Sequence, residues 1–153
     1  MRKLIADLVR IDPRDSNDNG LLHLVISKNN KLEQSYVTVH NIFPSPEVTR
    51  LLLECGAKVD TVNNEGCTPL HIACLKFHYN TKVRDILLEY GAHLCRANSR
   101  GTRPFKQLFR TDPSFNLLPY TSLRCLAARK IVEDKIAYQG VLPSILEDFL
   151  NIH

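Results

Sequence analysis

The sequence predicts an all-α protein built as a solenoid of stacked helical repeats, followed by a short C-terminal helical segment. Residues 48–60 and 83–95 share one pattern of leucines, a glycine and an alanine, and their glycines, Gly56 and Gly91, lie 35 positions apart. Residues 66–71 and 101–106 repeat at the same spacing. Two blocks with one period indicate units that stack to bury one another's apolar faces.

Composition limits the possible functions. The chain has 153 residues, 44% of them hydrophobic and 24% charged, which suits one globular core. The net charge of +4 is spread along the chain, so it argues for neither nucleic acid nor a membrane as partner. No apolar run approaches the roughly 20 residues that span a bilayer, and no export signal is recognisable. Five cysteines, an odd number without metal-type pairing, favour the cytoplasm or the nucleus.

The first element expected is a helix over residues 3–11. Leu4, Ile5, Leu8 and Val9 fall on one side of it, and Pro13 ends it. We interpret residues 1–13 as the partial second helix of a preceding repeat.

Each repeating unit reads as turn, helix, loop, helix. Thr68 is a suitable cap and Pro69 suits the first helical position, so a short helix begins there. A second helix is expected from about residue 82 to residue 89, with Gly91 adopting the left-handed conformation beyond its end. The turn formers of residues 63–66 separate the units.

Residues 14–112 hold about two and a half such units. A weaker copy starts at Gly20 and contains 13 extra residues, which predicts a surface loop insertion near 29–46. A further copy starts at Gly101 and loses its register after Leu108. Lys106 stands there in place of His71, so we interpret this copy as a degenerate end unit.

The stretch Thr68-Pro69-Leu70-His71-Ile72-Ala73, followed by residues 87–92, resembles an ankyrin repeat. The resemblance implies that the His71 imidazole ties the turn and that Cys74 occupies a small-residue position in the core. A zinc site made of Cys67, His71, Cys74 and His78 is the alternative. We favour the structural interpretation, because this spacing matches no recognised metal motif. No nucleophile arrangement or phosphate loop indicates catalysis.

Residues 113–153 are expected to form two short amphipathic helices. Ser122-Leu123-x-x-x-Ala127-x-x-x-Ile131 resembles the box by which substrate receptors bind elongin C. Leu142-Pro143-x-x-Leu146-x-x-x-Leu150 resembles the adjoining box that selects cullin-2. Together they resemble a VHL-type box. The related SOCS box, which recruits cullin-5, usually has a second proline, and Ser144-Ile145 lacks it.

Nearly the whole chain is similar to the C-terminal region of the Fem-1 family. The similarity lies in particular in residues 122–129 and 136–140 and in Pro143, Leu146, Glu147, Phe149, Ile152 and His153. Asp18 and Gly20 depart from that family's pattern at the first repeat. The resemblance implies a non-catalytic adaptor, without cofactors, of a cullin-2 ubiquitin ligase. The implied partners are elongin C, with elongin B, and cullin-2. The implied elongin-binding residues are Ser122, Leu123, Leu126, Ala127 and Ile131, and the implied cullin-binding residues are Leu142, Pro143, Leu146, Phe149 and Leu150.

Two alternatives remain open at this point. One is an ankyrin scaffold without a ligase role, in which the C-terminal helices only cap the stack, and the other is a SOCS-box adaptor that uses cullin-5. Members of the resembling family are longer and bind their substrates through an N-terminal ankyrin array. We therefore expect this chain to be a C-terminal fragment or a truncated relative, and we carry over no substrate-binding residue.

Overall fold

The computed structural model describes residues 2–27, 44–75, 80–116 and 118–121, together with residues 127, 130, 131, 134 and 136. Its secondary structure is entirely helical within these residues, as the sequence predicts. The elements are α1 (Arg2–Ile11), α2 (Leu21–Ile26), α3 (Pro46–Glu54), α4 (Pro69–Ala73), α5 (Thr81–Glu89), α6 (Pro104–Thr111) and the 3₁₀ helix η1 (Leu118–Tyr120).

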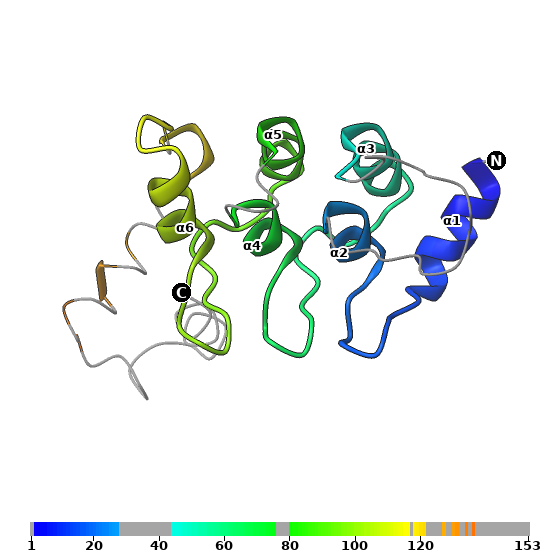
Figure 1. Ribbon diagram of the computed structural model, residues 1–153, viewed down its shortest axis with the longest axis horizontal. Helices are drawn as coiled ribbons and strands as arrows, with labels where there is room; N and C mark the ends of the chain where they lie inside the picture. Colours follow the sequence, from blue (N-terminus) through cyan, green and yellow to red (C-terminus); the bar gives the residue numbers. More distant parts are fainter. Residues whose placement is uncertain are drawn as a thin grey trace, which may run out of the picture.

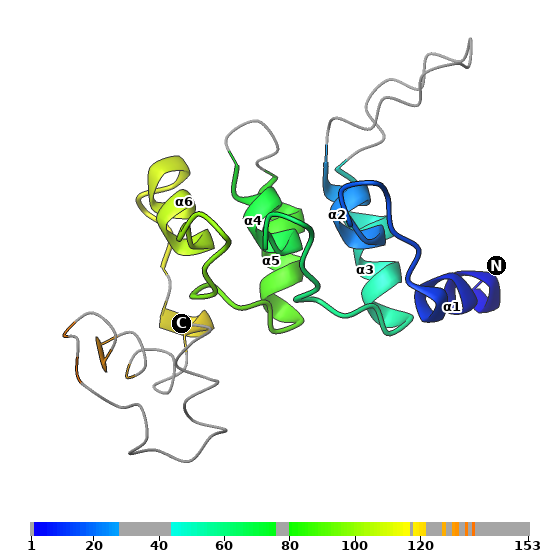
Figure 2. The ribbon, with the colours of Figure 1, turned by 90° about the horizontal axis from the view of Figure 1, so that it is seen from below.

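The helices form two rows. Helices α2 and α4 contact each other in one row, α3 and α5 contact each other in the second, and each short helix also packs on its longer neighbour. Figure 1 shows these pairs side by side along the molecule, with α6 following α4 at one end and α1 beside α3 at the other. Seen from below, the helix pairs follow one another along the long axis of the molecule (Figure 2). This is the helical solenoid that the repeat analysis predicts.

The start of α4 follows the predicted capping chemistry. The Thr68 side-chain oxygen accepts a hydrogen bond from the His71 N–H, and Pro69 is the first residue of α4. Asn80 caps α5 in the same way through the Val83 N–H, at 3.2 Å. Side-chain caps satisfy backbone donors that a helix start otherwise leaves open. Gly20 precedes α2 without such a side chain.

Glycine ends both long helices of the repeats. Gly56 after α3 has φ +93° and Gly91 after α5 has φ +84°, a backbone conformation that other residues adopt only at a cost. The N–H after each glycine bonds back to the helix: Ala57 donates to the Leu52 carbonyl at 3.0 Å, and Ala92 donates to the Leu87 carbonyl at 2.9 Å. The left-handed Gly91 that the sequence predicts is confirmed.

Asparagine builds the turns between units. The Asn63 side-chain oxygen accepts from the N–H of Glu65 and of Cys67, and Asn98 makes the same pair of bonds to Arg100 and Thr102. Neighbouring turns also bond to each other, because the Ser99 N–H donates to the Glu65 carbonyl at 3.0 Å. The 35-residue period thus extends to the hydrogen bonds of the turns.

The apolar core runs through the stack from α2 to α6. Ile26, Leu70, Val83 and Leu87 are fully buried, and Leu108 is 1% exposed. Because each unit contributes to one continuous cluster, no unit holds a core of its own. Helix α1 packs against this cluster through Ile5 and Val9. Leu4 and Leu8, which the sequence places on the same side, are exposed, as is Ile11.

Candidate functional site

Two buried histidines tie each repeat to the next. The Thr68 N–H donates to Nδ1 of His71 at 3.0 Å, and Nε2 of the same ring lies 3.1 Å from the Thr102 carbonyl oxygen. His23 repeats this arrangement: the Gly20 N–H donates to its Nδ1 at 3.2 Å, and its Nε2 lies 2.9 Å from the Cys67 carbonyl oxygen. Each ring therefore bonds one turn to the turn of the following unit.

These histidines are neutral structural groups. A carbonyl oxygen only accepts, so Nε2 carries the proton and Nδ1 accepts the backbone N–H. Burial lowers the pKa of both His23 and His71, which favours the same uncharged form. Because both ring nitrogens of His71 are engaged, the imidazole has no lone pair left for a metal. The predicted role of His71 in tying the turn is confirmed.

The cysteines near His71 are not arranged for reaction. Cys74 is fully buried in the core, as expected, and burial raises the pKa of its thiol to about 12. Burial also raises the pKa of the Cys67 thiol, which accepts a hydrogen bond from the Asn98 side chain at 3.3 Å. Nucleophilic and metal-binding cysteines need an accessible thiolate. His78 lies outside the described residues, and within those residues no three metal-ligating side chains come together.

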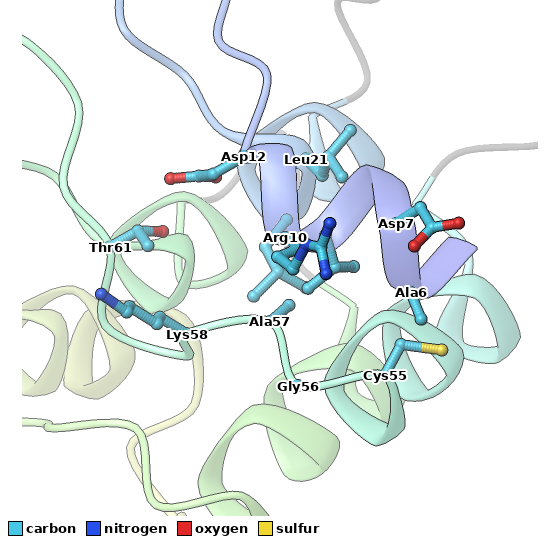
Figure 3. Close-up of a pocket in the computed structure, with 12 residues that line it drawn as sticks. Ala6, Asp7, Arg10, Asp12, Leu21, Cys55, Gly56, Ala57, Lys58 and Thr61 are labelled. Carbon is cyan, nitrogen blue, oxygen red and sulfur yellow. The ribbon is translucent and has the colours of Figure 1, made fainter. Parts of the chain in front are cut away.

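A pocket of about 560 Å³ lies between α1, the start of α2 and the turn after α3. Figure 3 shows side chains of both charge signs around it, with Arg10 and Asp7 on α1 and Lys58 on the turn. Asp12, also at its edge, is held by Arg14 at 2.9 Å. Since the charges do not favour one sign of ligand, we assign none to this pocket.

The residues that the sequence predicts to dock on elongin C and cullin-2 are described in part. Ala127 and Ile131 are helical, one turn apart, with Ala127 exposed and Ile131 half-buried. The Asp134 N–H donates to the Lys130 carbonyl at 2.9 Å, and the two side chains form an ion pair at 3.0 Å. The other predicted docking residues lie outside the described part of the chain: Ser122, Leu123, Leu126, Leu142, Pro143, Leu146, Phe149 and Leu150.

A buried arginine joins the last full repeat to the C-terminal part of the chain, and the sequence analysis did not identify it. The Arg84 side chain on α5 is 7% exposed and pairs with Asp85 at 2.7 Å and Asp112 at 3.2 Å. Its guanidinium lies over the Phe115 ring, 4.1 Å from the ring centre. The repeat pattern does indicate that Arg84 is buried, because the 35-residue period aligns it with Thr49 of α3, which is also buried.

Comparison with known proteins agrees with this fold. The family model "Ankyrin repeats (3 copies)" matches residues 2–98. The chain belongs to the ankyrin-repeat family, a class of interaction modules. In the described part of the chain, no helix combines the length and the apolar character needed to cross a bilayer.

The similarity to the Fem-1 family expected from the sequence is confirmed. The chain is 34% identical to protein fem-1 homolog C of Homo sapiens over 155 aligned residues, which cover 99% of this chain and 24% of the relative. It is 35% identical to the Drosophila melanogaster fem-1 homolog over 95% of this chain and 22% of the relative. It is 32% identical to protein fem-1 homolog A of Rattus norvegicus, over the same shares. The chain spans about a quarter of the length of these relatives.

Proposed function

We propose that the chain is the ligase-facing module of a substrate receptor for a cullin-2 ubiquitin ligase. Its C-terminal residues dock on elongin C and cullin-2, and it performs no catalysis of its own. One observation carries the proposal: similarity to Fem-1 proteins extends over 99% of the chain and so includes the box-like C-terminal segment. A plain ankyrin scaffold requires similarity only over the repeats.

The described residues of the first box support this role. Ala127 and Ile131 lie one helical turn apart, so they share a side of the helix. Ala127 is exposed, and its small side chain lets a partner approach the helix closely. Leu123 precedes Ala127 by four residues and completes the stripe in our prediction. Full burial of one leucine contributes about 1.5–3 kcal/mol, which makes Leu123 the expected hot spot.

The repeats contribute a fixed body and the C-terminal segment contributes the docking side chains. Neither His71, whose ring is engaged, nor Cys74, whose thiol is buried and protonated, offers a reactive group. We place the adaptor in the cytoplasm, or in the nucleus, because its five cysteines do not read as a disulfide framework.

Co-purification with elongins B and C tests the proposal. The full chain is expected to retain both elongins, and Leu123→Arg is expected to lose them while its helical circular dichroism stays unchanged. Leu4→Arg is the matched control, because Leu4 is 69% exposed on α1 and distant in sequence from the box. Elongin retention by Leu123→Arg contradicts the box assignment. The absence of elongins from the wild-type chain favours the scaffold alternative.

The same experiment identifies the cullin. Cullin-2 and cullin-5 are each offered to the elongin-bound chain. We expect cullin-2 alone to bind, because Leu142-Pro143-Ser144-Ile145 lacks the second proline typical of cullin-5 adaptors. Binding of cullin-5 in its place assigns the segment to the SOCS-box type.

A further inference from the structure

The described segment that follows α6 takes the place of a second helix in the last unit. In the two preceding units a long helix, α3 or α5, follows the short one. After α6 the chain instead makes a turn at residues 113–114 and a 3₁₀ helix at Leu118–Tyr120. Whatever lies beyond residue 121 is therefore connected to the repeats through residues 112–121.

Arg84 of α5 binds this connecting segment, in which two aromatic rings continue the stack that its guanidinium begins. The Arg84 guanidinium lies 4.1 Å from the Phe115 ring centre, and the Phe115 ring stacks on Tyr120 with centroids 5.7 Å apart and planes 13° apart. Arg84 also forms an ion pair at 3.2 Å with Asp112, which lies three residues before Phe115. Phe115 in turn packs against the apolar core. The buried Arg84 side chain thus holds the segment by an ion pair with Asp112 and by a cation–π contact with Phe115.

The end of the segment lies beside the same repeat. Tyr120 and Thr121 line a small cavity of about 130 Å³ together with Leu88 and residues 91–95, the turn after α5. The segment is therefore held at its start by Arg84, and its end lies beside the turn that Gly91 forms.

We propose that Arg84 is a positioning residue that fixes the described residues between 112 and 121 on the last full repeat and so sets the direction in which the C-terminal segment leaves the stack. A guanidinium suits this position better than an ammonium, because it pairs with carboxylates and stacks on an aromatic ring at the same time. The consequence for the ligase rests on the proposed function: an anchored segment holds the repeats at a fixed angle to the elongin-bound end.

Hydrogen exchange of the full chain, followed by mass spectrometry, tests the anchor. In Arg84→Met, amides of residues 112–121 are expected to exchange about tenfold faster, whereas those of α3 and α4 keep their rates. Arg84→Lys keeps a cation and is expected to fall between. The matched control is Arg50→Met, because Arg50 on α3 forms an exposed ion pair with Glu89, with side chains 46% and 53% exposed. It is expected to leave residues 112–121 unchanged.

Phe115→Leu keeps the test decisive if Arg84→Met fails to fold. It removes the ring that lies against Arg84 without altering α5, and it is expected to release residues 112–121 in the same way. Exchange within about twofold of wild type for residues 112–121 in Phe115→Leu, and in Arg84→Met where that variant folds, overturns the anchor.

Scattering of the complex with elongins B and C tests the direction. We expect Arg84→Met to bind the elongins as wild type does, because the predicted docking residues lie beyond residue 121, but to give a broader distribution of interatomic distances. An unchanged distribution overturns the claim that the anchor sets the angle. If the wild-type chain binds no elongin, the proposed function fails, and the exchange experiment still decides the anchor.

Discussion

The imidazole of His71 joins two repeats by donating from Nε2 to the carbonyl oxygen of Thr102, 31 residues later, at 3.1 Å. Its other nitrogen accepts the N–H of Thr68 in its own turn. One neutral side chain therefore satisfies backbone groups from two units. This relationship explains why the histidine belongs to the fold and not to a metal or catalytic site.

Removing this ring is expected to be costly. His71→Leu leaves the Thr68 N–H and the Thr102 carbonyl without their partner in a buried site, so we expect a loss of about 2–4 kcal/mol in the free energy of unfolding. Urea denaturation monitored by circular dichroism measures it. Lys106→Leu is the control, because Lys106 occupies the equivalent position in the next unit and is exposed, and it should change stability by less than about 0.5 kcal/mol. Equal effects of the two substitutions contradict the role given to His71.

Acid is expected to weaken the fold near neutrality. Burial lowers the pKa of His23 and His71 in the folded state, whereas both titrate near 6.5 when unfolded. The unfolded chain thus binds more protons as pH falls below about 6.5, and stability falls until the folded pKa is reached. Each histidine contributes a slope of up to about 1.4 kcal/mol per pH unit.

Urea titrations at pH 7.5, 6.5 and 5.5 measure this slope. In His23→Asn/His71→Asn the slope over this range is expected to disappear, whatever the loss of stability at pH 7.5. Asp15 is a built-in comparison, because hydrogen bonds from Asn19 lower its pKa and its contribution is lost only at more acidic pH. A stability that stays constant down to pH 5.5 contradicts the neutral buried histidines.

Two glycines in equivalent turns are expected to tolerate substitution differently. Gly66 has φ +70° and Gly101 has φ +69°, so alanine pays a similar backbone strain at each, about 1–2 kcal/mol. A Cβ on Gly66 would lie 3.0 Å from both the backbone nitrogen and the Oγ of Ser99, whereas one on Gly101 meets nothing within 4 Å. Gly66→Ala should therefore lower the melting temperature more than Gly101→Ala. The reverse order would show that the turns do not pack as described.

The two C-terminal boxes are expected to act separately. The double substitution Pro143→Ala/Leu146→Arg should abolish cullin-2 binding and leave elongin binding intact, because the implied cullin contacts lie in the second box. Pull-downs with elongins B and C, with and without cullin-2, measure both steps. Loss of the elongins together with cullin-2 would show that the two boxes form one unit.

The repeats could be predicted from the sequence because their chemistry is local. Thr68 and Pro69 start a helix and Gly91 ends one through backbone preferences that hold in most proteins, and the structure has both features. The resemblance to ankyrin repeats then gave His71 its role. Its partner, Thr102, follows once the 35-residue period is known.

The Arg84 anchor could not be predicted in this way. Its partners Asp112 and Phe115 lie about 30 residues away, beyond the point at which the repeat pattern is lost, so no period relates them. In an isolated sequence, an arginine on a helix is more often a solvent-exposed residue. The docking residues of the C-terminal boxes remain predictions, except that Ala127 and Ile131 are described as helical.

The affinity for purified elongin B–elongin C tests the central claim most directly. Calorimetric titration of the full chain is expected to show one-to-one binding, and Leu123→Arg is expected to weaken it by at least about tenfold, given the free energy of burying one leucine. The variant's circular dichroism should match wild type. Equal affinities of the two chains, or no binding by the wild-type chain, would contradict an adaptor that docks through this segment.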